Sequence, residues 1–273
     1  MKRAQAPRAL TPFEDVNALL HYFVDEAIPI FAANLVGVYL TGSLSYDAFN
    51  YETSDIDLTV ILKTPISASE LAAIKQLHKQ MESQFEKWSK RLECSYTPLE
   101  MLLSLLPPEK PRPWYWGGDG ILYEEAPYGN EWIINKYLLW HHAIPLAGAD
   151  FQSLTDAVDI AEVQKACVRD LFTEWEPKRR DPSWFRNDSH YEAYFILNLC
   201  RLLFTVMRGA AGSKQVAAAW VKLRYGPPWA DTVSLAEAWR YGMDLNLRAT
   251  ALAFLDFVIG EISKTELVQR LKS

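Results

Sequence analysis

The distribution of hydrophobic and polar residues divides the chain into a first part of strands and helices and a second part of helices. Leu35–Leu40 and Asp57–Leu62 are short apolar runs that predict buried strands. Leu92–Tyr96 alternates apolar and polar residues, which predicts a strand with one buried face. We expect one helix before the first strand and another between the second strand and the third.

Both of these helices have a recognisable start signal. Thr11 is expected to cap the first helix, with Glu14 completing a capping box. Ser67 and Glu70 show the same spacing before the second helix, which is expected to run to about Lys90. The first part of the chain therefore reads as a small mixed sheet with flanking helices.

The second part has a different pattern. Residues 102–128 are rich in Pro, Gly and Trp without a clear period, which predicts a long ordered loop. From Glu131 onward the apolar spacing is helical, and we expect an all-helical bundle. The expected fold class is α+β, with domains at 1–130 and 131–273 and a boundary placed between 97 and 130. The expected helical segments lie near 131–143, 155–175, 190–209, 213–224, 231–258 and 264–272.

Composition narrows the classes of function. Hydrophobic residues make up 49% and charged residues 23% of the 273 residues, which is typical of a globular protein. The net charge of −6 argues against electrostatic binding of nucleic acid and suits a cationic small molecule. Met1–Pro7 lacks the apolar stretch of a secretory signal, and no apolar run is long enough to span a membrane. Cys94, Cys167 and Cys200 stand singly in apolar surroundings, which predicts buried thiols in a cytoplasmic protein.

The most informative pattern joins a glycine turn to a pair of carboxylates. Gly42 and Ser43 follow the first strand, where backbone N–H groups and the Ser43 hydroxyl could approach a phosphate closely. Asp55 and Asp57 are two residues apart on an extended segment, so their side chains share a face. Such carboxylates repel each other unless a cation lies between them, and Mg²⁺ bridges carboxylates to phosphates.

Glu93 adds a third carboxylate on the polar face of the third strand. It could complete the metal shell or accept a proton from an attacking hydroxyl as a general base. Taken singly, an Asp-x-Asp pair is most often a surface feature, a Gly-Ser pair is a turn and Glu93 is a solvated strand residue. Their combination in one order of strands favours a catalytic site.

The glycine–serine turn followed by Asp-x-Asp resembles the signature of the nucleotidyltransferase superfamily of the DNA polymerase β type. Within it, the chain is most similar to the streptomycin/spectinomycin (aminoglycoside) adenylyltransferases, which carry a C-terminal helical domain. Three later segments carry this resemblance: Leu138–Gly148, Arg201–Trp220 and Glu237–Tyr241.

The resemblance implies a role for each matching residue. Asp55 and Asp57 would hold Mg²⁺, expected as a pair of ions, and bind the nucleotide, and Glu93 would be the catalytic base and a further metal ligand. Lys214 would contact the nucleotide phosphates, and Tyr241 would line the same cleft, expected between the two domains. The implied reaction transfers AMP from ATP to a hydroxyl of an aminoglycoside-like acceptor and releases pyrophosphate.

The chain departs from the family in two regions. An aromatic, proline-rich insert at Pro107–Asn130 replaces a differently built segment. The family's acceptor-contacting Trp and acidic residues match less clearly, and Trp184, Asp188 and Glu192 are the nearest candidates. A different acceptor, such as another small metabolite or a protein, therefore stays open, as does a non-catalytic, antitoxin-like regulatory member of the fold. Oligomeric state and the nucleotide's base are not predicted.

Overall fold

The computed structural model describes residues 10–272, which form two compact units. The first unit contains the described residues up to Phe49, together with Ser54–Tyr128 and Leu139–Asp156. The second contains Asn50–Thr53, Gly129–Leu138 and the described residues after Asp156. Met1–Pro7, in which no secretory signal is expected, lies outside the described residues.

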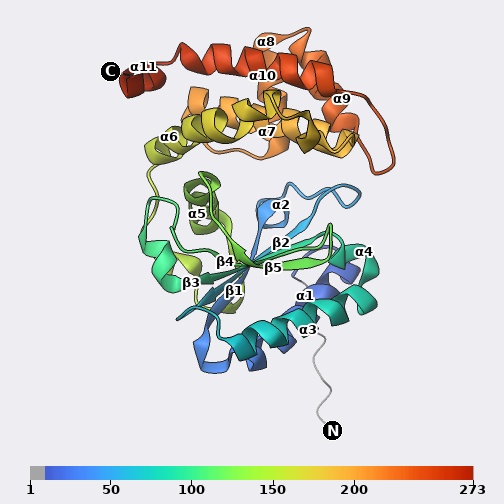
Figure 1. Ribbon diagram of the computed structural model, residues 1–273, viewed down its shortest axis with the longest axis vertical. Coiled ribbons are helices and arrows are strands. Elements are labelled where there is room, and N and C mark those ends of the chain that lie inside the picture. Colours follow the sequence, from blue (N-terminus) through green and yellow to red (C-terminus); the bar gives the residue numbers. More distant parts are fainter. Residues whose placement is uncertain (1–9, 273) are drawn as a thin grey trace. The chain divides into compact units, whose positions relative to one another are not determined.

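The first unit is built on a six-stranded mixed sheet in the order β5-β4-β3-β2-β1-β6 (Figure 1). Only the central pair β2 and β3 is parallel, and every other neighbouring pair is antiparallel. This confirms the α+β class. The strands are β1 (Leu35–Thr41), β2 (Ile56–Leu62), β3 (Leu92–Pro98), β4 (Arg112–Trp116), β5 (Ile121–Ala126) and β6 (Ile144–Gly148).

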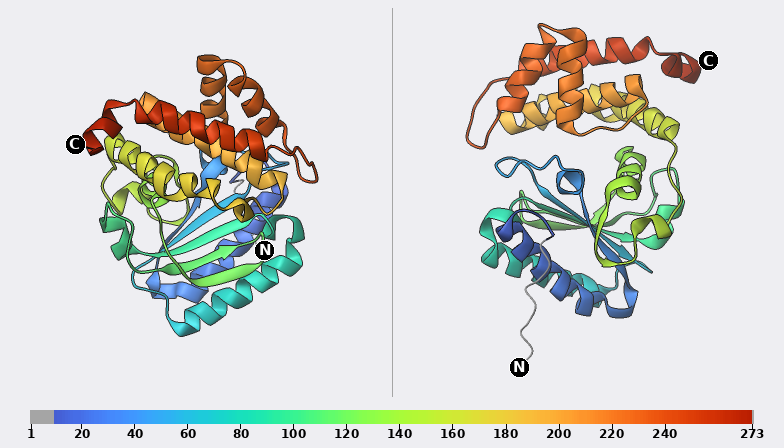
Figure 2. Two further views of the ribbon diagram at one scale, coloured as in Figure 1. Left: turned by 45° about the horizontal axis from the view of Figure 1, so that its top comes forward. Right: turned by 180° about the vertical axis from the view of Figure 1, so that it is seen from behind.

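Helices α1 (Glu14–Phe31) and α3 (Ala68–Gln84) lie side by side against one face of this sheet, with the short α4 (Glu86–Ser89) after them (Figures 1 and 2). The alternation of the strands explains which face they cover. Leu58, Cys94 and Tyr115 are buried on the helix side, where the His78 ring stacks on Tyr115 with centroids 3.7 Å apart. The neighbouring positions of the same strands therefore face the other way, and Asp57 and Glu93 are among them.

Residues 102–128 differ from the long loop predicted for them. After the 3-10 helix η2 (Leu99–Leu103), the segment forms the β4–β5 hairpin. The β4 strand alternates half-buried Trp114 and Trp116 with the buried Tyr115, which is a period of two. Large aromatic residues on both faces hide this period, because each of them counts as apolar.

The helical unit packs around α7, which contacts α6, α8, α9 and α10 (Figure 1). Its core is a continuous cluster that includes Phe195, Leu199, Val221 and Phe254. This unit also contains the 3-10 helices η5 (Glu176–Arg179) and η6 (Pro182–Phe185) and a π-helical turn η4 (Leu171–Trp175), whereas the 3-10 helix η3 (Phe151–Ser153) belongs to the first unit. Helix α5 (Glu131–His142) is shared, because its residues from Leu139 onward belong to the first unit. The other helices are α6 (Ile160–Asp170), α7 (Ser189–Arg208), α8 (Lys214–Tyr225), α9 (Trp229–Ala238), α10 (Arg248–Ser263) and α11 (Glu266–Lys272).

Several predicted elements need correction. Ile144–Gly148 was expected within the helical part but forms strand β6, which pairs with β1 in the sheet. The helix expected over 231–258 is interrupted between α9 and α10 by a segment with turns, where Gly242 has a φ of 86° and Asn246 a φ of 47°. Helices do not continue through left-handed backbone.

The N-terminal cap of α1 also differs from its prediction. The N-cap residue is Phe13, and its side chain makes no capping hydrogen bond. Thr11 lies outside the helix, where its backbone N–H donates to the Asn17 side chain at 2.8 Å. The predicted capping box at Ser67 and Glu70 is confirmed, although α3 ends at Gln84.

Two sequence predictions, on membrane-spanning segments and on burial of the cysteines, can be compared with the described residues. No helix among them has the length and apolar character needed to cross a membrane. Cys94, Cys167 and Cys200 are free thiols and buried, and burial raises their pKa values, that of Cys94 and of Cys167 to about 12.

The buried His78 gives the first testable prediction. Burial lowers its pKa from 6.5 to about 3, so the folded protein keeps the imidazole neutral while the unfolded chain protonates it. As the pH falls from about 6.5 towards 3, the unfolded state binds the extra proton and His78 costs stability, by about 1.4 kcal/mol per pH unit. Urea unfolding midpoints of the wild type and of His78→Gln, measured across this range, should converge as the pH falls.

A second titrating group does not disturb this comparison. Burial raises the pKa of Asp170 from 3.8 to about 6, so its contribution has the opposite sign between these values. Asp170 is present in both proteins and cancels in the difference between them. Parallel pH profiles for wild type and His78→Gln would contradict the neutral, buried imidazole.

Candidate active site

The turn after β1 is shaped by a glycine that lies against a carboxylate. Gly42 has a φ of 61°, a left-handed conformation that residues with a Cβ adopt at a cost. A Cβ on Gly42 would lie 1.8 Å from Oδ2 of Asp57. Glycine is therefore required here both by its backbone conformation and by the close approach of Asp57.

The helix that follows Gly42 is shorter than the sequence pattern suggests. Helix α2 (Gly42–Ser45) is a single turn, and the Ser45 hydroxyl donates to the Gly42 carbonyl at 2.8 Å. The N–H of Ala48 donates to the Ser43 carbonyl at 3.0 Å, which closes the turn. One turn provides little helix dipole, so binding of a phosphate here depends on individual N–H groups and on the Ser43 hydroxyl.

The structure pairs two of the three predicted carboxylates at the start of the parallel strands, and the third lies just before one of these strands. Asp57 and Glu93 are direct partners in the parallel register of β2 and β3, which places their side chains on the same face. Asp55 immediately precedes β2 and lies two residues before Asp57. The pairing of β2 with the segment that leads into β3 extends to this first residue of β2, because the Ile56 N–H donates to the Arg91 carbonyl at 2.7 Å. All three acids are partly exposed.

These residues fit a magnesium ion that arrives with a phosphate-bearing ligand. Across residues 10–272, no three His, Cys, Asp or Glu side chains are already arranged as a metal shell. Mg²⁺ keeps several waters and is commonly bound by one or two carboxylates together with substrate phosphates. An all-oxygen donor set beside an open glycine turn meets that requirement.

Two predicted nucleotide-binding residues of the helical unit belong to one aromatic cluster. Lys214 begins α8, and its Nζ lies 4.4 Å from the centre of the Tyr194 ring. Tyr241 lies in the turn after α9, with half of its surface exposed. The His190 ring links them, with its centroid 6.4 Å from that of Tyr194 and 5.9 Å from that of Tyr241.

The predicted acceptor-binding residues lie near the start of α7 in the same unit. Asp188 is the N-cap of α7 and accepts a hydrogen bond from the His190 N–H at 2.8 Å. Glu192 is 4% exposed, accepts from the Leu247 N–H at 2.6 Å and lies near Arg248. Trp184 packs within a group of aromatic rings. Both carboxylates thus support the fold, and their contact with an acceptor stays a prediction.

Sequence reasoning missed residues that the hairpin adds to the carboxylate face. Trp116 is the antiparallel partner of Glu93, and Trp114 is the partner of Ser95, so both indoles lie on the face that carries Glu93. The alternation of tryptophan and tyrosine in β4 was the sequence pattern that could have identified these residues.

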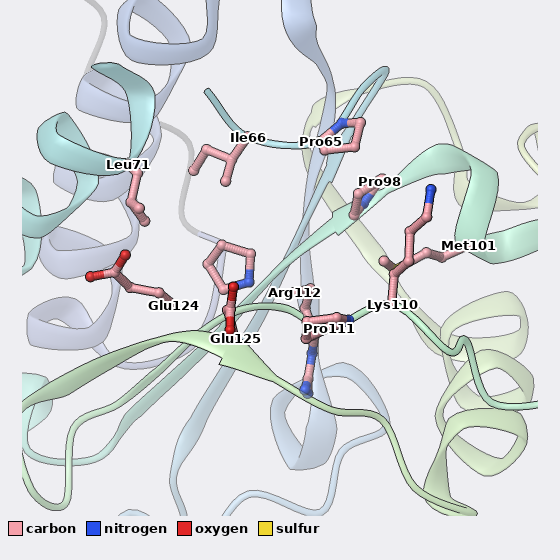
Figure 3. Close-up of a pocket in the computed structure, with 11 residues that line it drawn as sticks. Pro65, Ile66, Leu71, Pro98, Met101, Lys110, Pro111, Arg112, Glu124 and Glu125 are labelled. Atoms are coloured by element: carbon pink, nitrogen blue, oxygen red, sulfur yellow. The ribbon is translucent and has the colours of Figure 1, made fainter. Parts of the chain in front are cut away.

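A pocket of about 230 Å³ lies at the opposite end of the sheet (Figure 3). Its lining includes Pro65, which follows β2, Pro98 at the end of β3, and Arg112 at the start of β4. The three carboxylates lie at the first residues of β2 and β3 or just before them. The pocket contains none of the predicted site residues, and we assign it no part in the chemistry.

The chain is similar in sequence and in fold to known proteins. The family described as "Aminoglycoside adenylyltransferase, C-terminal domain" matches residues 155–258. The spectinomycin 9-adenylyltransferase of Campylobacter jejuni is 25% identical over 262 residues, which cover 87% of this chain and 93% of that protein. The crystal structure of a spectinomycin adenyltransferase from Enterococcus faecialis, with ATP and spectinomycin, superposes with a TM-score of 0.68 at 15% identity, covering 90% of this chain and 99% of the other.

The structural match shows that the chain has the fold of that spectinomycin adenyltransferase structure, with a mixed sheet and a helical part. The similarity in sequence extends through both units and confirms the resemblance inferred from the motifs. These similarities indicate that the chain is a nucleotidyltransferase that resembles the aminoglycoside adenylyltransferases.

The contact between Gly42 and Asp57 gives a prediction. Gly42→Ala should displace the Asp57 carboxylate and abolish Mg²⁺-dependent ATP binding, measured by isothermal titration calorimetry. The matched control is Gly226→Ala, because Gly226 has the same φ of 61° but nothing within 4 Å of an added Cβ. Both variants should lose about 1–3 kcal/mol of stability through backbone strain, and Gly42→Ala should lose more than this because its Cβ also meets Asp57. Equal ATP affinity in the two variants would contradict the proposed role of the glycine.

Proposed function

We propose that this chain transfers the adenylyl group of ATP to a hydroxyl of an aminoglycoside-like acceptor and releases pyrophosphate, with Mg²⁺ bound at Asp55, Asp57 and Glu93. The observation that carries the proposal is the register of the parallel strands, which sets Asp57 directly beside Glu93. The contact between Gly42 and the Asp57 carboxylate joins the phosphate-binding turn to the same place.

The residues have separate tasks in this reaction. The backbone around Gly42 and the Ser43 hydroxyl hold the β- and γ-phosphates, since β1 delivers them beside Asp57. Glu93 accepts the proton of the acceptor hydroxyl, whose oxygen forms a bond to the α-phosphorus. The bond from that phosphorus to the bridging oxygen breaks, and pyrophosphate leaves with the electron pair. When bound, Mg²⁺ neutralises charge on the phosphates and helps to align the two oxygens.

The acceptor is proposed from charge and from relatives. The net charge of −6 and the carboxylates of the site favour a cationic molecule over an anionic one. The relative from Campylobacter jejuni is named for spectinomycin, and the structure from Enterococcus faecialis contains spectinomycin with ATP. We extend this substrate class to the present chain, together with a role in antibiotic resistance in the cytoplasm.

The helical unit contributes further residues in this proposal. Lys214 contacts the phosphates of the nucleotide, and Tyr241 contacts the nucleotide in the same aromatic cluster. Trp184, Asp188 and Glu192 are assigned to the acceptor on the family resemblance. The polar atoms of Asp188 and Glu192 already make internal contacts, so these two assignments have less support from the structure than Lys214 has.

The first test of function is pyrophosphate release from ATP and Mg²⁺ with spectinomycin, streptomycin and other aminoglycosides. Wild type should release pyrophosphate only when an acceptor is present. Glu93→Gln keeps the size of the side chain but cannot take the proton, and its kcat should fall by about 10²–10⁴-fold. The control is Glu100→Gln, because Glu100 is an exposed acid whose ion pair with Lys110 lies outside the site; this variant should keep the wild-type rate.

Three results would change the proposal. Binding of ATP without turnover of any aminoglycoside would favour another small metabolite or a protein as acceptor. If the protein binds ATP, does not modify these acceptors and instead regulates the activity of a partner protein, the regulatory, antitoxin-like alternative would be favoured. Unchanged turnover in Glu93→Gln would remove Glu93 from the mechanism.

Lys214 gives a separate prediction. Lys214→Met removes the ammonium group but keeps a long apolar chain against Tyr194, so the KM for ATP should rise by about tenfold or more, while the KM for the acceptor stays constant. Lys264→Met is the control, because Lys264 pairs with Glu261 at the end of α10. Equal ATP KM values for wild type and Lys214→Met would contradict the phosphate contact.

A further inference from the structure

A histidine lies beside the phosphate-binding turn (α2, Gly42–Ser45), on the side away from the carboxylates. His142 is the last residue of α5, and β6 begins two residues later. In the antiparallel register of β1 and β6, Leu40 pairs with Ile144. Partners in such a ladder advance in opposite directions, so the same register continued by two residues brings His142 beside Gly42. Both residues belong to the first unit.

A ring contact independently places His142 at this turn. The centroid of its ring lies 5.6 Å from that of Tyr46, and the two rings meet edge to face, with 65° between their planes. Tyr46 directly follows the turn that Gly42 begins. The loop around Tyr46 is closed by the Ala48 N–H, which donates to the Ser43 carbonyl at 3.0 Å. The His142 imidazole therefore packs against the end of the phosphate-binding turn, while the residue stays exposed.

The last turn of α5 is fixed by contacts with the segment that follows β6. The Trp140 indole N–H donates to the Thr155 carbonyl at 3.2 Å. The Gln152 side-chain amide donates to the Trp140 carbonyl at 2.6 Å. These two hydrogen bonds hold the end of the helix from both its side chain and its backbone. The backbone of His142 thus has a defined position next to β1.

The order of the strands places His142 and the carboxylates on opposite sides of the turn. Strand β1 lies between β6 and β2, and its last residue, Thr41, pairs with Asp57 on the β2 side. Glu93 lies one strand further in the same direction. A triphosphate held at Gly42 therefore has the metal-binding acids on one side and an imidazole on the other.

We propose that the His142 imidazole donates a hydrogen bond to the β- or γ-phosphate of ATP and holds the pyrophosphate as it leaves. A neutral imidazole has one N–H and an imidazolium has two, so a donor is present in either state. When the bond from the α-phosphorus to the bridging oxygen breaks, the electron pair stays on that oxygen. A hydrogen bond to the pyrophosphate strengthens as this charge develops, without transfer of the proton. This inference rests on the proposed adenylyl transfer and adds a residue that recognises the leaving group.

A histidine at the end of a helix has a second possible role, which the experiment has to separate from the first. Cationic side chains in the last turn interact favourably with the last carbonyl groups and with the helix dipole. If His142 acted only in this way, its replacement would change the stability of the protein and leave nucleotide binding unchanged. The experiment therefore measures both stability and binding.

The test compares the affinities of the full chain for ATP and for AMP, each with Mg²⁺ and without acceptor, by isothermal titration calorimetry. His142→Phe keeps a ring against Tyr46 but has no N–H, so its Kd for ATP should rise by about tenfold. Its Kd for AMP should stay at the wild-type value, because AMP lacks the β- and γ-phosphates. His142→Gln supplies an amide N–H and should recover part of the loss. In steady state with spectinomycin, His142→Phe should also weaken product inhibition by pyrophosphate.

His21→Phe is the control for losing one imidazole. His21 lies on α1, which covers the face of the sheet opposite to that of Asp57 and Glu93. Its affinities for ATP and for AMP should match those of wild type. Thermal unfolding of all three variants separates loss of binding from loss of fold.

The outcomes distinguish this inference from the proposed function. If wild type adenylylates spectinomycin and His142→Phe binds ATP as tightly as wild type does, the inference fails although the function stands. Loss of affinity for ATP and for AMP by the same factor would assign His142 to the nucleoside site or to the fold, and would also overturn the inference. If no acceptor is modified but His142→Phe weakens binding of ATP and not of AMP, the phosphate contact stands while the proposed transfer fails.

Discussion

The site depends on electrostatic repulsion between carboxylates that the sheet holds together. Asp57 and Glu93 are neighbours in the parallel register, and adjacent strands lie about 5 Å apart. Two unit charges at that separation repel by on the order of 3 kcal/mol at an effective dielectric constant of about 20. A cation relieves this repulsion, and a nucleoside triphosphate brings both the cation and the phosphates that share it. The fold thus favours binding of the metal ion and the nucleoside triphosphate that the reaction needs.

Packing on the opposite face of the same strands keeps the carboxylates in place. Each strand alternates, so the residues that flank Asp57 and Glu93, such as Leu58 and Cys94, are buried beneath α1 and α3. Sliding either strand by one residue would turn its apolar side chains outward and its acid inward. Hydrophobic burial therefore fixes the register, and the register brings the acids together. Gly42 adds the phosphate-binding turn to this arrangement because it alone lets the backbone approach Asp57 so closely.

The sequence predicted this part of the molecule well because strand alternation has an unambiguous period. The spacing of Asp55 and Asp57 placed them on one face, and Glu93 stood on the polar face of its strand between apolar neighbours, so the local pattern identified all three acids. The direct pairing of Asp57 with Glu93 did not follow from it, because register between distant strands depends on tertiary packing. The β4–β5 hairpin was missed because Trp114, Tyr115 and Trp116 conceal alternation behind uniformly large aromatic side chains. Strand β6 was missed because it joins the sheet through β1, far away in sequence.

The helical unit shows the same limit on sequence reasoning. Its helices followed from apolar spacing, but the interruption between α9 and α10 depends on left-handed residues in a segment without a strong breaker such as proline. That interruption places Tyr241 in a turn, where it joins the His190 and Trp239 rings. The spacing of apolar residues therefore could not predict that aromatic rings link Lys214 to Tyr241.

The measurement that tests the central claim most directly is mass spectrometry of spectinomycin after incubation with the protein, ATP and Mg²⁺. Wild type should yield an acceptor heavier by one adenylyl group, and chelation of the metal should prevent this. Asp57→Asn, which removes one of the two paired charges at nearly constant shape, should yield no adenylylated product while the protein remains folded. Undiminished product from Asp57→Asn would contradict the account, because the paired carboxylates would then not be needed for the transfer.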